Sequence, residues 1–199
     1  MACEKIRASK LQKRSSNSLI HLADTHTALL SSGNAADARQ IANRAREESS
    51  SYYETFDDVI PPKVLADRLS LYIQAHTMYS SVRPFGVYCI LAVGNSLYLF
   101  EPSGNYSGFK ACATGKNSQL AKNELQNLKM LNLSCDEALL EAAKIIYICH
   151  KENREKDFDL ELSYYDLSNN NHKIVDNEYS SKLLKDAIDA FNASMQYGT

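Results

Sequence analysis

Two short glycine-containing segments could in principle bind a phosphate or activate a serine. A phosphate-binding loop needs a glycine five residues before its Gly-Lys-Ser/Thr end. Here Lys110 stands where the glycine should precede Gly115-Lys116, and Asn117 follows where a hydroxyl is needed. The segment 104–108 places its serine one position too late for a nucleophile elbow. Neither nucleotide binding nor serine catalysis is predicted.

The histidines and cysteines do not form a predicted catalytic or metal centre. Cys149 and His150 follow each other in a predicted helix, so their side chains diverge by about 100 degrees. His21 and His26 flank a predicted turn without further ligands at zinc spacing. We therefore expect a core thiol beside a helix-end histidine, and no metal or cofactor.

Several carboxylates could be imagined as acid–base pairs. They are Asp57-Asp58 in one stretch and Asp157, Asp159 and Glu161 in another. Both stretches are rich in charge, which is typical of a solvated face. We therefore interpret these carboxylates as solvent-exposed and not catalytic.

Composition narrows the possible classes of function. The chain has 199 residues, 44% of them hydrophobic, and a net charge of -2 from 22 basic and 24 acidic residues. This balance gives no basic surface for nucleic acid. No apolar run approaches the roughly 18 residues of a membrane helix, and the start has no signal-peptide core. The five scattered cysteines favour reduced core thiols in an intracellular chain.

Hydrophobic periodicity indicates both strands and helices. Strands are expected over residues 19–23, 27–30, 87–93, 97–100, 106–113, 158–164 and 173–175, and helices over 34 to about 51, 61 to before 84, from about 117, from 134, and after 175. The first helix should be capped by Asn34, with Asp37 at its third position. Ser134 and Glu137 form a capping box. This order, without regular β-α alternation, favours an α+β fold with antiparallel sheets.

Prolines and glycines stand where the chain must turn between these elements. The segments are Arg83-Pro84-Phe85-Gly86 and Pro102-Ser103-Gly104, with Gly115 further along. Such residues fix turns. We interpret them as structural.

The same arrangement resembles a known family. Residues 83–126 resemble proteasome alpha subunits, which carry Arg-Pro-Phe/Tyr-Gly, acidic-Pro-Ser/Ala-Gly and Ala-x-Gly segments in this order. Glu4-Lys5 and Ser9-Lys10-Leu11 are also similar to family segments, and the likeness runs to Val175. Leu65 to Arg68 and Ala143 to Ile148 look closest to alpha type three. The residues that match the family's motifs at turns and helix starts are Gly33, Asp37, Arg39, Arg83, Pro84, Gly86, Pro102, Gly104 and Gly115.

The resemblance implies a fold and a role. The fold is a four-layer α-β-β-α sandwich of two antiparallel sheets, as in N-terminal nucleophile hydrolases, in a single domain over residues 1–199. The role is a non-catalytic subunit of a heteroheptameric alpha ring in cytoplasm and nucleus, which templates and contacts the beta ring, gates substrate entry and docks regulatory particles. No catalytic residue, cofactor, metal, nucleic acid or membrane is implied.

The sequence departs from the family at its start and at one pocket position. The family's opening segments are absent, so we expect the N-terminal helix, the first strand or strands and the gating tail to be missing. Leu19 stands where some alpha subunits carry the lysine of an activator pocket. Two alternatives stay open: a stand-alone interaction module of this fold, and a beta-type threonine peptidase, for which Met1-Ala2 offers no N-terminal threonine.

Overall fold

The chain forms two compact units. The computed structural model describes residues 1–6, 9, 11–13, 17–128, 133–153 and 158–196, so Lys10 and Asp157 lie outside the described residues. The five-stranded unit comprises Leu19–Gly115 with Tyr165–His172, and the three-stranded unit comprises Met1–Ser18, Lys116–Tyr164 and Lys173–Thr199. Among the helices described, none is long and apolar enough to span a bilayer.

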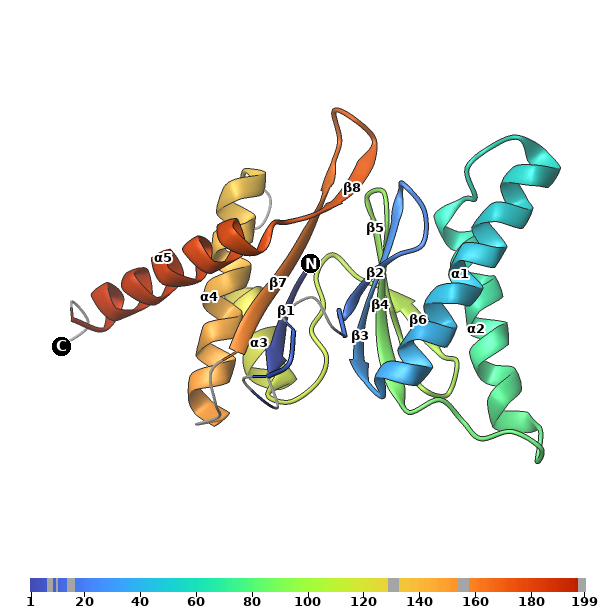
Figure 1. Ribbon diagram of the computed structural model, residues 1–199, viewed down its shortest axis with the longest axis horizontal. Helices are drawn as coiled ribbons and strands as arrows, with labels where there is room; N and C mark the ends of the chain where they lie inside the picture. Colours follow the sequence, from blue (N-terminus) through green and yellow to red (C-terminus); the bar gives the residue numbers. More distant parts are fainter. Residues whose placement is uncertain (7–8, 10, 14–16, 129–132, 154–157, 197–199) are drawn as a thin grey trace. The chain divides into compact units, whose positions relative to one another are not determined.

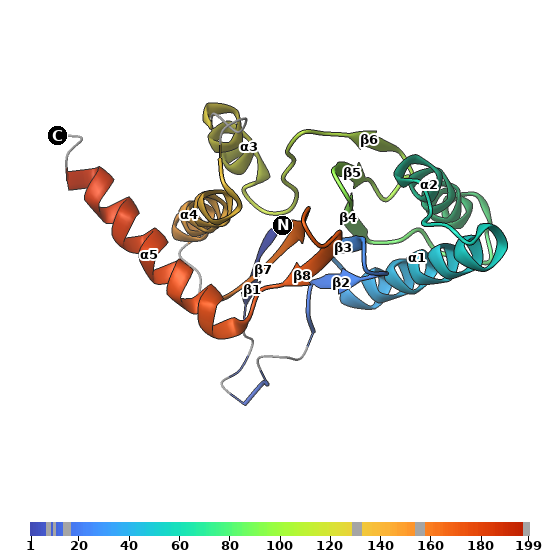
Figure 2. The same cartoon turned by 90° about the horizontal axis from the view of Figure 1, so that it is seen from above.

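The five-stranded unit is an antiparallel sheet with two helices on one face. Its strands are β2 (Ile20–Leu22), β3 (Thr27–Gly33), β4 (Val87–Val93), β5 (Ser96–Phe100) and β6 (Tyr106–Gly108), in spatial order β2-β3-β4-β5-β6. The helices α1 (Ala35–Phe56) and α2 (Pro62–Met78) pack against each other and against this sheet (Figure 1; Figure 2).

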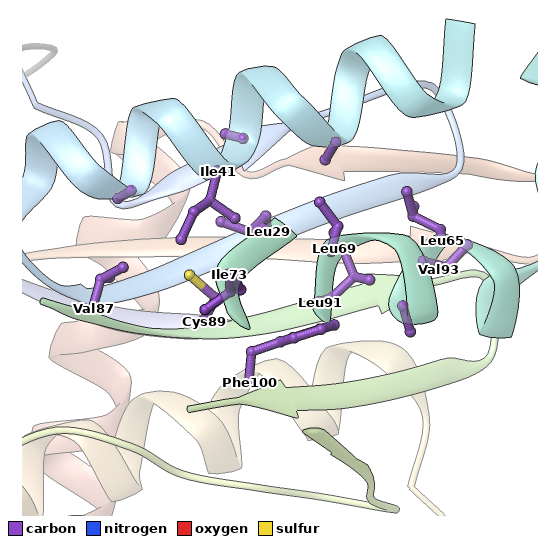
Figure 3. Close-up of a cluster of buried hydrophobic side chains, with 14 of the residues drawn as sticks. Leu29, Ile41, Leu65, Leu69, Ile73, Val87, Cys89, Leu91, Val93 and Phe100 are labelled. Carbon is purple, nitrogen blue, oxygen red and sulfur yellow. The ribbon is translucent and has the colours of Figure 1, made fainter. Parts of the chain in front are cut away.

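Alternate residues of the central strands face these helices. Leu29, Cys89 and Leu91 on β3 and β4 are almost fully buried against Ile41 of α1 and Leu69 of α2. Figure 3 shows these side chains pointing toward one another between helices and sheet. Each large buried side chain contributes roughly 1.5–3 kcal/mol, so this cluster holds the two helices on the sheet.

The first helix begins as predicted and ends later. Asn34 caps it by accepting a hydrogen bond from the Ala36 N–H at 2.9 Å, and Asp37 lies in the first turn. The helix continues past the serine run to Phe56, because Tyr52 still packs against the core. It stops where Asp57 adopts a left-handed conformation with φ of 53°.

The three-stranded unit is built on a sheet of β1 (Ala2–Ile6), β7 (Phe158–Asp166) and β8 (Asn171–Ile174) in the order β1-β7-β8, although the last residues of β7 and the first of β8 are counted with the five-stranded unit. Its helices are α3 (Ser118–Asn127), α4 (Cys135–Asn153) and α5 (Asn177–Gln196). The predicted capping box is confirmed, since the Glu137 carboxylate accepts from the Ser134 N–H at 2.8 Å. A second core joins β7 to α4 and α5 through Leu139, Leu162 and Ala187.

The prediction of a wet face on β7 is wrong. Ser163 is fully buried, and the Glu161 carboxylate accepts a hydrogen bond at 2.9 Å from the buried ammonium of Lys5 on β1. Alternation in a strand predicts which side chains share a face, but it does not predict that the polar face is exposed. A polar face can be buried when its charged groups are paired. Glu161 is therefore a structural ion-pair residue, not a solvated one.

Strand β6 is also shorter than the predicted 106–113. It pairs with β5 only from Tyr106 to Gly108, and the last ladder-like bond runs from the Phe109 N–H to the Leu97 carbonyl at 2.9 Å. Beyond that point β5 has turned into its hairpin with β4, so no partner backbone continues the ladder. The α+β class with two antiparallel sheets is nevertheless confirmed. The single-domain prediction stays a prediction.

Candidate functional site

Three of the motif residues meet where α1 begins and β4 is about to start. The Asp37 carboxylate accepts two hydrogen bonds from the Arg83 guanidinium, both at 2.7 Å, one to each carboxylate oxygen. It also accepts from the backbone N–H of Gly86 at 2.8 Å. One carboxylate on a helix thus fixes the arginine side chain and the backbone of the Arg-Pro-Phe-Gly turn.

The burial of the two partners differs. The side chain of Asp37 is 5% exposed, whereas that of Arg83 is 65% exposed. The Arg83 hydrogen bonds hold the pKa of Asp37 below its ordinary value, and the Gly86 N–H acts in the same direction. The position of Asp37 in the first helical turn adds a favourable interaction with the helix dipole. The carboxylate is therefore ionised and committed to structure, not available as a base.

Gly33 lies at the same junction and is required by its backbone. Its φ is 137°, and an added Cβ would lie 2.4 Å from the Gly86 carbonyl oxygen. That carbonyl also accepts a hydrogen bond from the Asn34 N–H at 2.9 Å. By contrast, the φ of Gly86 lies outside the left-handed region, and its added Cβ would meet only the Asp37 carboxylate at 3.8 Å. Of these two positions, only Gly33 requires glycine, whereas Gly86 contributes its backbone N–H and carbonyl.

The Pro102-Ser103-Gly104 turn attaches the end of β5 to α2. Gly104 has a φ of 88°, and an added Cβ would lie 2.8 Å from the backbone nitrogen of Gln74. The Ser70 hydroxyl donates to the Gly104 carbonyl at 2.7 Å. Gly115, with φ of 101°, lies against Ser32, whose hydroxyl would be 2.8 Å from an added Cβ. Gly104 thus approaches backbone atoms that any side chain would displace, whereas Gly115 is required mainly by its positive φ, because the Ser32 hydroxyl can rotate away.

Two further motif residues, Arg39 and Pro84, lie on the surface. Arg39 is exposed and, among the described residues, donates only within its own helix, to the Ala35 carbonyl at 3.2 Å. Pro84 is exposed as well, but its carbonyl accepts a hydrogen bond from the Arg83 guanidinium at 3.0 Å. Within the described part of the chain, Arg39 therefore makes no hydrogen bond to another element.

An ion-pair cluster between α1 and α2 was not predicted. The Glu48 carboxylate accepts hydrogen bonds from Arg44 and, at 2.8 Å, from Arg68. The guanidinium of Arg44 lies over the Tyr72 ring at 5.3 Å from its centroid, and that of Arg68 over the Tyr52 ring at 5.8 Å. The spacing of Arg44 and Glu48 by four residues was the available sequence signal.

The described residues contain no activated nucleophile among their buried thiols. Burial raises the pKa of Cys89 to about 12 and also raises the pKa values of Cys3 and Cys149. Reactive cysteines need the opposite shift. Within the described part of the chain no group of three or more potential metal ligands occurs. The site is a set of backbone-fixing contacts.

Comparison with known proteins identifies the family of this chain. A family profile described as proteasome subunit matches residues 1–164. The chain belongs to the proteasome subunit family. It is 46% identical over 197 residues to the probable proteasome subunit alpha type-7 of Saccharomyces cerevisiae, covering 94% of this chain and 67% of that protein.

Other relatives of this proteasome subunit are of alpha type. It is 41% identical over 201 residues to proteasome subunit alpha type-3 of Dictyostelium discoideum, covering 94% of this chain and 80% of the relative. It is 40% identical over 201 residues to proteasome subunit alpha type-3 of Oryza sativa subsp. japonica, covering 98% and 79%. The predicted alpha-type resemblance is confirmed, and with it a structural subunit of the proteasome core in place of a peptidase.

Proposed function

We propose that the chain occupies one position in a heteroheptameric alpha ring of the proteasome core particle, in cytoplasm and nucleus. There it contacts neighbouring alpha subunits and the beta ring, and the ring it completes gates substrate entry and docks regulatory particles. The likeness to alpha-type relatives over 94% or more of the chain carries this proposal. Assembly with other proteasome subunits follows from the family itself.

The end of α1 supports assembly because it carries a surface that is unfavourable for an isolated chain. Tyr53, Phe56 and Val59 are 57%, 59% and 41% exposed. Around them Glu54 and the pair Asp57-Asp58 place negative charge at a helix C-terminus, and no basic residue lies in the last turn. Acidic groups at a helix C-terminus interact unfavourably with the helix dipole. Exposed aromatic side chains are unfavourable in water. A neighbouring subunit that covers the apolar side chains and places a lysine or arginine beside the carboxylates would remove both unfavourable interactions.

The role can be tested by co-sedimentation of a tagged full-length chain with the core particle. We expect the chain to sediment at the size of the particle together with other proteasome subunits. A chain that folds normally but stays at its own mass would contradict the proposal and favour the stand-alone module.

A matched pair of variants tests the surface at the end of α1. Tyr53→Ser with Phe56→Ser should leave the fold intact, because both rings lie largely in solvent, but should lower incorporation into the particle. Leu167→Ser is the control, since Leu167 is 67% exposed on the β7–β8 turn. Equal incorporation of both variants would show that the end of α1 makes no subunit contact.

A further inference from the structure

One side of α1 carries a row of exposed residues at the alternating spacing of four and three that is typical of paired helices. The row consists of Arg39, Asn43, Arg46, Ser50, Tyr53 and Asp57. At 3.6 residues per turn these positions form one stripe about 80 degrees wide along the helix. The residues of α1 that contact the sheet and α2, such as Ile41 and Glu48, lie outside this stripe. The row is therefore a surface of α1 that its own unit leaves exposed.

The two ends of the row carry opposite charges that have no ionic partner in the described part of the chain. Arg39 and Arg46 at one end donate to backbone carbonyls and to one side-chain amide, all of which are neutral acceptors. At the other end neither Asp57 nor Glu54, which lies beside the row, forms an ion pair with a described residue. A surface of the reversed polarity would therefore complement the row.

A second copy of the chain offers that reversed polarity when its α1 packs antiparallel on the row. A twofold axis halfway between Arg46 and Ser50 makes the contact isologous, so each residue pair occurs twice. The opposed pairs are Arg39 with Asp57, Asn43 with Tyr53, and Arg46 with Ser50. A parallel arrangement would place Arg39 against Arg39, and like charges in contact are unfavourable. The row thus specifies the antiparallel orientation.

We propose that this row joins two copies of the chain as an antiparallel helix pair. The short side chains of Asn43 and Ser50 let the two helices approach closely, and Tyr53, which is 57% exposed, becomes covered. The pairing needs no other proteasome subunit. Tyr53 also belongs to the surface at the end of α1 that contacts another subunit in the assembled particle. The pair therefore covers the assembly surface of free chains and must separate before incorporation, a consequence that rests on the proposed function.

Sedimentation velocity of the purified full-length chain over a range of concentrations tests the pairing. We expect a monomer–dimer equilibrium in the micromolar range, because a contact of six residues per chain is smaller than a standard interface. The dissociation constant should rise about tenfold when sodium chloride is raised from about 50 mM to about 500 mM, because salt screens exposed ion pairs. A chain that stays monomeric at all concentrations would overturn the inference, as would a dimer that does not respond to salt.

Charge reversals identify the residues that pair. Arg39→Glu and Asp57→Lys each place like charges opposite one another, so each variant alone should bind its own copies at least about tenfold more weakly. An equal mixture of the two variants should form a heterodimer, because the opposed end positions then again carry opposite charges. Lys63→Glu, at an exposed position at the start of α2, is the control and should leave the equilibrium unchanged.

Urea midpoints of the variants check that each one folds. Failure of the mixture to restore dimers would overturn the inference, and so would equal weakening by Lys63→Glu. Either result leaves the proposed function intact, because incorporation into the particle is a separate measurement. Failure of the wild-type chain to incorporate would remove the proposed function without affecting the pairing.

Discussion

The close packing at the junction of β3 and α1 predicts opposite effects of alanine at Gly33 and at Gly86. Substituting Gly33→Ala places a Cβ 2.4 Å from the Gly86 carbonyl oxygen and 2.9 Å from the Cα of Val87. Both are backbone atoms, so no side-chain rotation relieves the overlap. The substitution also forces alanine to adopt a φ of 137°.

The cost can be worked from these contacts. Holding a residue other than glycine in such a conformation costs roughly 1–3 kcal/mol. Moving the strands apart stretches the hydrogen bond from the Asn34 N–H to the Gly86 carbonyl, which is 2.9 Å long, and losing it costs about 1 kcal/mol more. We expect Gly33→Ala to lower the free energy of unfolding by about 3 kcal/mol, roughly a hundredfold in the folding equilibrium.

Gly86→Ala is the matched control. Its backbone lies outside the left-handed region, and the nearest atom to the new Cβ is 3.8 Å away. Alanine at such a position restricts the unfolded chain and is neutral or stabilising by up to about 1 kcal/mol. The assay is urea unfolding followed by far-ultraviolet circular dichroism, because the chain has no tryptophan. Equal unfolding free energies for the two variants would refute this reasoning.

Three further predictions concern charge, packing and reactivity. Asp37→Asn should lower the free energy of unfolding by about 2 kcal/mol at neutral pH. The folded-state pKa of Asp37 lies below its ordinary value of 3.8, so the contribution of its carboxylate to stability is lost as pH falls through that folded pKa. The difference in unfolding free energy between the variant and wild type should therefore shrink in urea titrations at acid pH, and a constant difference would contradict the assignment. Leu69→Ala removes a fully buried side chain and should cost about 2–5 kcal/mol in the same assay, and a loss below 1 kcal/mol would argue against the described core. A thiol reagent should label the exposed Cys135 before Cys3 and Cys89, because burial raises the pKa values of those two thiols, and mass spectrometry can follow the order of labelling. Labelling of Cys89 first would mean that the core is open to solvent.

Local signals in the sequence predicted much of the fold. Asn34 before a helix, proline at the start of α2 and the Ser134–Glu137 capping box each act within one turn, so their spacing alone located helix starts. The apolar run 87–93 likewise located β4. These features depend on neighbours in the chain and can be recognised without the rest of the structure.

The contacts of the site were not predictable in the same way. Asp37 and Arg83 are 46 residues apart, and Lys5 and Glu161 are 156 residues apart. No periodicity or spacing links such pairs, because only the pairing of strands and the packing of α1 bring them together. The sequence indicated that Gly33 and Arg83 matter, and the structure adds that they meet at one junction.

Native mass spectrometry of intact particles purified through a tag on this chain tests the central claim most directly. The account predicts an assembled core particle in which this chain occurs once in each alpha ring, beside six other alpha-type subunits. Recovery of the folded chain alone, or of a particle in which it takes a position in the beta ring, would contradict the account.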